Sequence, residues 1–269
     1  MPPEVASLWA LWQQLEASQW WTPQAIESHQ LRQLLVLLER FQRLPSLGGE
    51  RLHAVKAKLE AGASLADVMA LLPLTSRRDL QARSSEPEPK LVGHGRLTQL
   101  KTSGSSGEPV SLYVAHWLFQ LRAALTLRGH QWHQLDFMKK FGAIRGGVRE
   151  QGAPVRSLPA WGGVVSRFFQ SGPSVALDIT TPLDEQVKWL HRERPQIFLS
   201  LPSNLEALLD LVPEPWPGLV DVLTISETLS PSLRERIVAQ WGCRVHDKYS
   251  SEELGAIAVC SIGDSAMTE

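Results

Sequence analysis

The chain has 269 residues and a formal net charge of -1, so its charge gives no sign of a general attraction to nucleic acid or to anionic membranes. It has 2 cysteines, Cys243 and Cys260, which exclude a disulfide scaffold and fit a reducing compartment. The first residues lack the basic start and apolar core of a signal peptide, and no apolar run is long enough to cross a bilayer. We therefore expect a cytoplasmic protein with a sizeable core and with no nucleic-acid or membrane partner.

Residues 1–85 are expected to form a helical N-terminal region. Leucine and tryptophan side chains from Leu8 to Leu15 recur on one helical face. Thr22-Pro23 has the form of an N-cap followed by proline at the first helical position, and Ser64 is predicted to cap a later short helix. The proline- and serine-containing stretch 83–90 is the clearest boundary in the chain.

Residues 86–269 alternate strand-like and helix-like segments, which predicts an α/β fold with a mostly parallel sheet covered by helices. Strands are predicted at 174–179, 196–201, 219–225, 244–247 and 255–261, and helices at 116–127, from 181 onward, at 203–211 and at 230–241. Ser203 to Glu206 has the spacing of a capping box. In such sheets ligands bind at the carboxyl ends of strands, where the pattern places Ser226-Glu227-Thr228 and Tyr249-Ser250-Ser251-Glu252.

A loop rich in glycine and hydroxyl residues lies between two strand-like segments, 96–101 and 110–114. Its residues are Thr102, Ser103, Gly104, Ser105, Ser106 and Gly107, followed by Glu108 and Pro109. Such a loop can turn several N–H and hydroxyl donors toward one phosphate chain, and the alternative is a flexible linker. The loop leads into a strand rather than a helix, so it matches neither the Walker pattern nor the dinucleotide fingerprint. The flanking strands favour a phosphate loop of hairpin type.

Four stretches in order across nearly the whole chain resemble the motifs of the adenylate-forming ligases, most closely those of the phenylacetate–CoA ligase branch. They are 72–80, the loop 102–109, 202–205 together with 225–227, and 247–255. The resemblance implies the larger part of an N-terminal domain of an adenylate-forming enzyme. It implies that a small-molecule carboxylic acid attacks ATP to give an acyl-adenylate and pyrophosphate, and that CoA or another thiol then takes the acyl group. A homodimer is part of this expectation.

The resemblance also implies roles for particular residues. Thr102 to Gly107 would hold the β- and γ-phosphates of ATP, and Glu252 would bind Mg²⁺, which offsets charge on the phosphate oxygens. Ser251 would hydrogen-bond near the α-phosphate. In the nucleotide pocket, Tyr249 would stack on the adenine beside Ser250, and Ser226 with Glu227 would line the base. Trp161-Gly162-Gly163 lies where the family builds its acyl pocket, although a buried structural tryptophan is an equal alternative.

The chain departs from the family pattern in two respects. Many members carry a cation within or just after the phosphate loop, whereas this chain has Glu108, Pro109 and Val110 there. The sequence also ends at Glu269, before the family's ribose-binding aspartate, hinge and small lysine-bearing domain would follow, so the core at 86–269 is expected to be incomplete at its C-terminus. The alternative function is therefore a truncated, non-catalytic homologue that binds nucleotide or a protein partner.

Histidines, cysteines and basic residues supply weaker candidates. His130 and His133 have metal-like spacing without a third ligand nearby, and Cys243 and His246 should point to opposite faces of a strand. Cys260 is a zinc candidate only with a histidine outside this sequence, so no zinc is assigned. A basic cluster, Lys139, Lys140, Arg145 and Arg149, is interpreted as a solvated face, with CoA phosphates as the minority reading.

Overall fold

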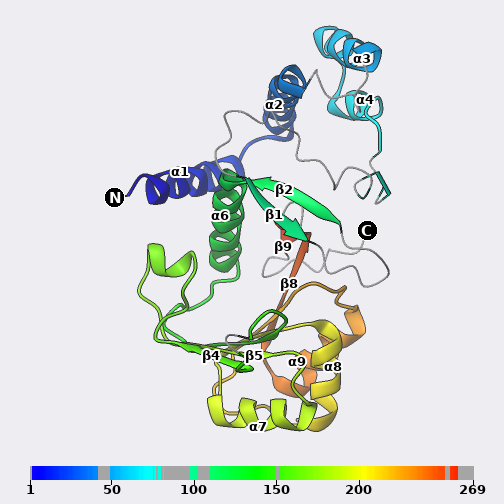
Figure 1. Cartoon of the computed structure of the whole chain (residues 1–269). Coiled ribbons are helices and arrows are strands. Elements are labelled where there is room, and N and C mark those ends of the chain that lie inside the picture. The colour runs from blue at the N-terminus through cyan, green and yellow to red at the C-terminus, as the bar shows by residue number, and fades with distance from the viewer. Residues whose placement is uncertain are drawn as a thin grey trace. The chain divides into compact units, whose positions relative to one another are not determined.

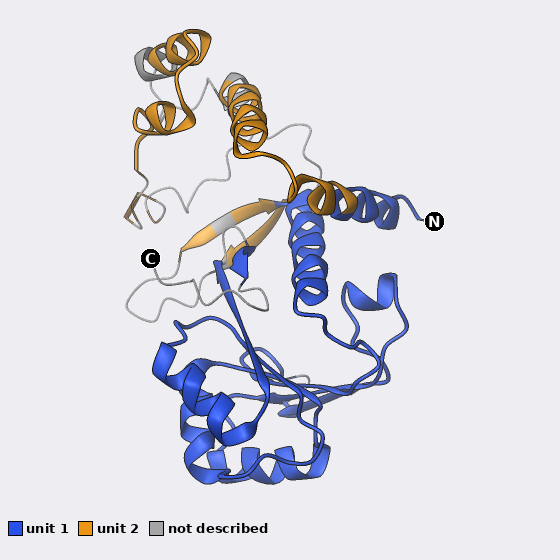
Figure 2. Ribbon diagram, turned by 180° about the vertical axis from the view of Figure 1, so that it is seen from behind, with its two compact units in different colours: residues 1–12, 115–269 blue, residues 13–114 orange. Residues whose placement is uncertain are grey.

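A computed structural model describes residues 2–41, 49–74, 76, 78–79, 81, 97–101, 110–149, 152–251 and 255–259. The chain divides into two compact units (Figure 2): unit 1 comprises residues 1–12 and 115–269, and unit 2 comprises residues 13–114. The predicted boundary at 85–86 falls in a stretch outside the described residues, so it stays a prediction.

Among its described residues, unit 2 contains the end of α1 (Pro3–Ser18) and the helices α2 (Pro23–Phe41), α3 (Gly49–Glu60) and α4 (Leu65–Met69). Their ends follow local signals, because the Thr22 hydroxyl accepts a hydrogen bond from the Ala25 N–H and the Ser64 hydroxyl accepts one from Asp67. Two strands, β1 (Leu97–Lys101) and β2 (Ser111–Ala115), pair with each other, which confirms the predicted strands on either side of the glycine- and serine-rich loop.

Unit 1 is built on a sheet of 7 strands in the order β4-β5-β3-β6-β7-β8-β9. The strands are β3 (Phe141–Arg145), β4 (Val155–Leu158), β5 (Ser174–Asp178), β6 (Ile197–Ser200), β7 (Asp221–Thr224), β8 (Arg244–Ser251) and β9 (Gly255–Val259). Neighbours from β5 to β8 pair in parallel, whereas β4 and β9 pair antiparallel at the two edges. The predicted α/β fold with a mostly parallel sheet is confirmed.

The sequence pattern does not predict β3 or β4, although β3 is a central strand of the sheet. Gly142 interrupts the short apolar run of β3 and lowers its strand signal. The same glycine is required by the packing, because an ideal Cβ at Gly142 would lie 2.5 Å from the Cβ of Pro195. The close approach lets the chain that enters β6 pack directly on β3.

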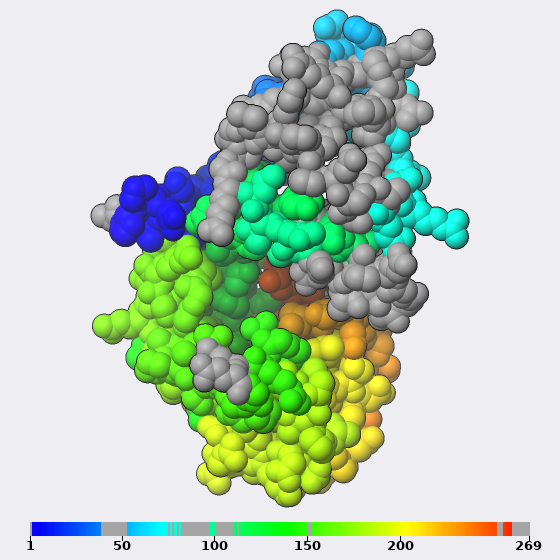
Figure 3. Space-filling model, viewed as in Figure 1, coloured from blue at the N-terminus to red at the C-terminus, as the bar shows by residue number. Residues whose placement is uncertain are grey.

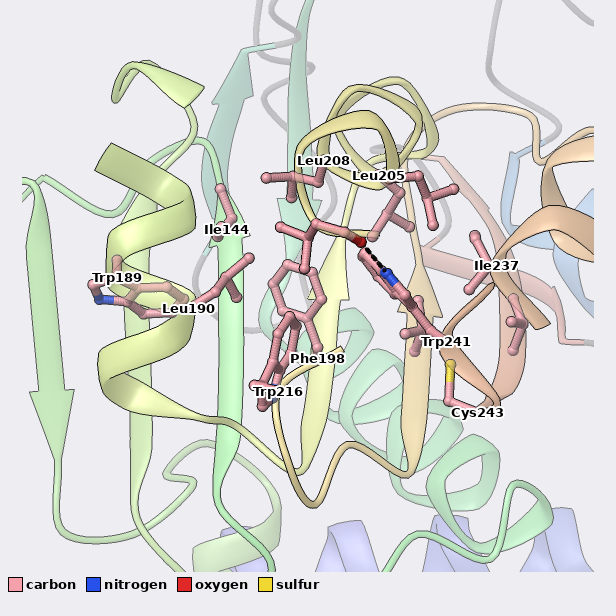
Figure 4. Packing of buried hydrophobic residues seen from close by; sticks show 14 of the residues in the cluster. Ile144, Trp189, Leu190, Phe198, Leu205, Leu208, Trp216, Ile237, Trp241 and Cys243 are labelled. Carbon is pink, nitrogen blue, oxygen red and sulfur yellow. Dashed lines mark hydrogen bonds between the residues drawn. The ribbon is translucent and has the colours of Figure 1, made fainter. Parts of the chain in front are cut away.

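Three helices cover one face of the sheet, namely α7 (Leu183–Glu193), α8 (Pro202–Leu211) and α9 (Pro231–Trp241), as Figure 1 shows. Between them and the strands lies the main apolar core (Figure 4). Phe198 and Trp216 meet edge-on with ring centroids 5.6 Å apart, and Trp241 donates its indole N–H to the Val212 carbonyl at 2.9 Å. Fully burying one such apolar side chain stabilises the fold by about 1.5–3 kcal/mol.

The ends of these helices also follow local signals. The Ser230 hydroxyl accepts a hydrogen bond from the Leu233 N–H at 3.2 Å, and α9 ends at Gly242, which has a left-handed φ of 62°. On the outer surface of α7, yellow-green in Figure 3, Lys188 pairs with Asp184 at 3.5 Å. The predicted start of α7 and the predicted start and stop of α9 are confirmed.

The opposite face of the sheet is covered by α6 (His116–Trp132) and by a short 3-10 turn at Val165–Arg167 (Figure 1). Helix α1 (Pro3–Ser18) begins in unit 1, where the Trp12 indole donates a hydrogen bond to the Gln131 side chain at 2.9 Å. None of the described helices combines the length and the apolar content that a bilayer crossing needs.

Candidate active site

The parallel strands of unit 1 reverse their winding direction between β3 and β6. Numbered in chain order, the strands from β5 to β8 lie in the order 2-1-3-4-5, and ligands of such doubly wound sheets bind where the strand order switches, outside the carboxyl ends. Arg145, the last residue of β3, and Gly146 and Gly147, which follow it, are exposed at this point. The sequence pattern missed them because it missed β3, although the paired glycines after a strand are the signal that could have found them.

The predicted base-pocket residues follow β7 at this edge. Ser226 is exposed and has a φ of 70°, a left-handed conformation that residues with a Cβ seldom adopt. Glu227 accepts two hydrogen bonds from Ser203, one from its N–H at 2.9 Å and one from its hydroxyl at 3.0 Å. Because Ser203 lies in the first turn of α8, the Glu227 carboxylate caps that helix and meets its positive end.

This contact corrects the predicted capping box at Ser203 to Glu206. Helix α8 begins at Pro202, its N-cap residue Leu201 makes no side-chain cap, and the Ser203 hydroxyl donates to Glu227. The cap therefore comes from another element, the loop after β7, rather than from the helix's own sequence. Leu201-Pro202 already presets the first helical turn, so the serine is free for this use.

The end of β8 brings the second predicted cluster to the same edge. Thr224, the last residue of β7, lies opposite Asp247 in the parallel register, and its hydroxyl bonds to the Asp247 carboxylate. Beyond this point β8 pairs only with β9, with a register irregularity between Tyr249 and Ser250. Tyr249 is 62% exposed, and Ser251 ends the strand.

Seven predicted site residues lie outside the described residues. They are Thr102, Ser103, Gly104, Ser105, Ser106 and Gly107 of the phosphate loop, and Glu252. Their roles remain predictions. For Mg²⁺, a carboxylate such as that of Glu252 is the type of oxygen ligand that the ion prefers.

A buried polar network, not predicted from the sequence, supports the switch point. Ser200 at the end of β6 donates to the Ile144 carbonyl of β3 at 3.0 Å and accepts a hydrogen bond from Asn204 of α8 at 3.1 Å. Asn204 also donates to Gln186 of α7 at 3.0 Å, and Gln186 donates to the Thr181 carbonyl at 2.8 Å. The network joins two strands and two helices, so it fixes the first turn of α8, from which Ser203 binds Glu227.

At the end of β5, Asp178 organises a second polar group. Hydrogen bonds from the Thr180 hydroxyl and N–H lower the pKa of the Asp178 carboxyl below its usual value, and Arg149 adds to this effect. Arg149 lies 3.6 Å from Asp178 and donates to Thr180 at 2.8 Å.

The basic residues near β3 do not form one cluster. Lys139 and Lys140 precede β3 and pair with Asp136 and Glu193, whereas Arg145 and Arg149 lie at its opposite end. They are therefore individually solvated or paired, in agreement with the interpretation as a solvated face.

Trp161 lies in an aromatic cluster on the α6 side of the sheet. Its ring centroid is 5.0 Å from that of Phe141 and 5.3 Å from that of Phe137, and its indole N–H donates to the Lys139 carbonyl at 2.8 Å. Gly162 and Gly163 follow with φ values of 76° and 55°. These contacts give Trp161 a structural role, and its role in an acyl pocket stays a prediction.

No group of three or more His, Cys, Asp or Glu within the described residues could hold a metal ion. Burial raises the pKa of the Cys243 thiol to about 12, as expected for a side chain in the main core. His246 points to the other face, where it stacks on His133 with ring centroids 4.2 Å apart. The predicted opposite orientation of Cys243 and His246 is confirmed.

Comparisons with known proteins agree in fold. No known family profile matches the chain, and no curated protein matches its sequence. Among solved structures, 2-hydroxyisobutyryl-CoA ligase in the postadenylation state with 2-HIB-AMP is similar, with a TM-score of 0.64, 17% identity, and coverage of 87% of this chain and 50% of the ligase. Its open conformation with 2-HIB-AMP and CoA gives a TM-score of 0.59, 16% identity, and coverage of 83% and 49%.

An anthranilate CoA ligase in complex with anthranoyl-AMP is more distant, with a TM-score of 0.45, 18% identity, and coverage of 62% of this chain and 31% of the ligase. The chain spans about half the length of 2-hydroxyisobutyryl-CoA ligase. The predicted resemblance is therefore confirmed in fold: the chain has the architecture of the N-terminal portion of the adenylate-forming acyl-CoA ligases.

Proposed function

We propose that the chain belongs to an ATP-dependent enzyme that activates a carboxylic acid as its acyl-adenylate. The carboxylate oxygen of the acid would attack the α-phosphorus of ATP, and the bond to the β-phosphate would break to release pyrophosphate. CoA or another thiol would then attack the acyl carbon and release AMP. The proposal includes that the enzyme belongs to the phenylacetate–CoA ligase branch and that its substrate is an aromatic or otherwise apolar acid. It also includes a cytoplasmic location and a homodimer.

The observation that supports the proposal is the convergence of two predicted nucleotide clusters at one edge of the sheet. Thr224 and Asp247 are register partners, so Ser226-Glu227 after β7 and Tyr249-Ser250-Ser251 on β8 leave adjacent strand positions. Tyr249 is 62% exposed, and Ser226 has a φ of 70°. A strained backbone at such an edge is typical of functional sites.

Each side chain then has a defined part in the proposed reaction. Tyr249 would stack on the adenine, and the hydroxyls of Ser250 and Ser251 would donate to the nucleotide near its α-phosphate. Glu227, held by Ser203, would position the loop that lines the base. The Thr102 to Gly107 loop would hold the leaving pyrophosphate, and Glu252 would be the Mg²⁺ ligand.

Acid-dependent exchange of labelled pyrophosphate into ATP tests the proposal, with the 269-residue chain and a panel of carboxylic acids. We expect exchange that requires an acid and Mg²⁺, and that falls at least about fivefold in Tyr249→Ala, because base stacking contributes about 1–3 kcal/mol. An exposed tryptophan outside the site, changed as Trp20→Ala, is the matched control and should leave exchange unchanged.

The cation-free sequence Glu108-Pro109-Val110 favours a second candidate, a non-catalytic protein that binds the nucleotide. Equilibrium binding of AMP separates the two candidates. AMP binding that Tyr249→Ala abolishes, without exchange for any acid, would favour the non-catalytic protein. Neither exchange nor AMP binding would refute both candidates.

A further inference from the structure

Polar residues of α6 and of its C-cap lie against β8 and β9, where a helix packed on a sheet would ordinarily present apolar residues. Residues spaced three or four apart share this side. The Arg122 side chain lies against Gly255, Thr126 meets Lys248, and His133, directly after α6, stacks on His246. A polar seam therefore runs between α6 and the strand that bears the proposed nucleotide contacts.

Lys248 has unused hydrogen-bonding capacity in this seam. Its ammonium lies 3.5 Å from the Thr126 hydroxyl, which is the long limit of a hydrogen bond. An ammonium group has three N–H donors, and among the described residues only the Thr126 hydroxyl accepts a hydrogen bond from Lys248. Burial, and then the positive charge of Arg122, lower the pKa of Lys248. Within the described residues, no carboxylate forms an ion pair with this half-buried cation.

The charged groups that the structure describes around Lys248 do not compensate its positive charge. Burial, the charge of Lys248 and then His133 lower the pKa of His130 to about 3, so its imidazole is neutral at physiological pH. Asp221 of β7, the carboxylate beside His246, is hydrogen-bonded to His246 at 2.8 Å and to Arg244 at 2.9 Å. A half-buried cation without a counter-ion is unfavourable, and binding of an anion would relieve that cost.

The position of Lys248 indicates which anion it would meet. It lies between Asp247 and Tyr249, and Ser250 is two residues further, a distance of about 7 Å along a strand. One ammonium and one hydroxyl match the two oxygens of a carboxylate, whereas phosphate groups are usually met by more donors.

We propose that Lys248 and Thr126 form a carboxylate-binding subsite for the acid substrate. The Lys248 ammonium binds one carboxylate oxygen, and the Thr126 hydroxyl donates to the other. This inference rests on the proposed adenylation function and deepens it, because it assigns a charged substrate group to a named pair of residues. The carboxylate is either the one that reacts with ATP or a second acidic group of the same substrate.

The subsite is tested by calorimetric titration of phenylacetate and 1,4-phenylenediacetate into the 269-residue chain. The variant is Lys248→Met. The matched control is Lys188→Met, which changes an exposed lysine on α7. We expect Lys248→Met to weaken binding by about tenfold or more, because a charge-assisted hydrogen bond is lost. Weaker binding of both acids would show that Lys248 binds the carboxylate that reacts with ATP. Weaker binding of the diacid alone would show that Lys248 binds a second carboxylate of the substrate. Binding of both acids within about twofold of wild type in Lys248→Met, or no binding of either acid by the wild type, overturns the subsite.

Stability and exchange complete the test. Removing an uncompensated cation should leave the thermal midpoint of Lys248→Met equal to or above that of wild type, and a midpoint several degrees lower would overturn the subsite by showing a structural partner. Acid binding that is lost in Lys248→Met without any pyrophosphate exchange would keep the subsite and refute the adenylation function. Exchange that Lys248→Met leaves unchanged with both phenylacetate and 1,4-phenylenediacetate would refute the subsite and keep the adenylation function.

Discussion

The buried carboxylate of Asp221 at the start of β7 gives the sharpest stability prediction. Asp221 is 0% exposed and accepts hydrogen bonds from the Arg244 guanidinium at 2.9 Å and from His246 at 2.8 Å. Breaking one partner of a buried ion pair costs about 3–5 kcal/mol, and we expect the lower end for Asp221→Asn because Arg244 is 39% exposed. A loss of about 3 kcal/mol corresponds to a fall of roughly 6–12 °C in Tm.

The same carboxylate gives a pH signature. Burial raises the pKa of Asp221, but hydrogen bonds from His246 and Arg244 outweigh burial, so the pKa lies below its usual value. An acid whose folded-state pKa is depressed stabilises the fold above its unfolded pKa, near 4, and that stabilisation is lost as the pH falls through the folded value. Asp221→Asn should therefore lower stability at pH 7 and reduce the loss of stability in acid.

Urea unfolding, followed by tryptophan fluorescence and far-UV circular dichroism, measures both effects. The matched control is Asp210→Asn, because the Asp210 carboxylate is 67% exposed and pairs with Arg236 at the surface. An exposed pair contributes about 0.2–1 kcal/mol, so the control should differ little from wild type. Asp221→Asn destabilising no more than Asp210→Asn would refute the reasoning.

Three further predictions concern packing, pH and the site loop. An ideal Cβ at Gly172 would lie 2.3 Å from the Met138 carbonyl oxygen, so Gly172→Ala should lower the urea midpoint by the equivalent of about 3 kcal/mol or more, whereas Gly146→Ala, with open space around it, should not. The pKa of His130 is about 3 in the fold against 6.5 ordinarily, so the stability that its neutral form contributes is complete above pH 6.5 and declines as the pH falls toward 3. His130→Gln should therefore make the free energy of unfolding depend less on pH between pH 6.5 and 4.5. The same slope in wild type and His130→Gln would contradict this prediction. Glu227→Ala removes the cap of α8 and should cost about 1–2 kcal/mol in urea unfolding, and a neutral result would exclude that capping role.

Local signals in the sequence predicted much of the fold. Caps at Thr22, Ser64 and Ser230 and the stop at Gly242 depend on neighbours within one turn, so they are visible in the sequence and are confirmed. Strand–helix alternation after residue 90 predicted the parallel α/β class for the same reason. The central strand β3 was not predicted because Gly142 weakens its strand pattern. Glycine is needed there because Pro195, far along the chain, packs against this position.

For the candidate site as well, the sequence predicted the residues and the fold determined which of them lie together. Motifs in the sequence predicted Ser226, Glu227, Tyr249, Ser250 and Ser251 as site residues, and strand periodicity placed them at carboxyl ends. Their adjacency follows from the register of β7 with β8, which the sequence does not encode in any short segment. The Ser200, Asn204 and Gln186 network was missed, because single polar residues give no pattern until β6, α7 and α8 meet.

By itself, the sequence determined the class of the fold, most helix ends, the opposite directions of Cys243 and His246, and the residue types of the candidate site. The tertiary structure decided the strand order, the capping of α8 by Glu227, and the meeting of Lys248 with Thr126. The physical reason is the distance along the chain over which each interaction acts. Periodicity and capping act within a few residues, whereas strand order and buried charge depend on contacts between segments that are distant in the chain.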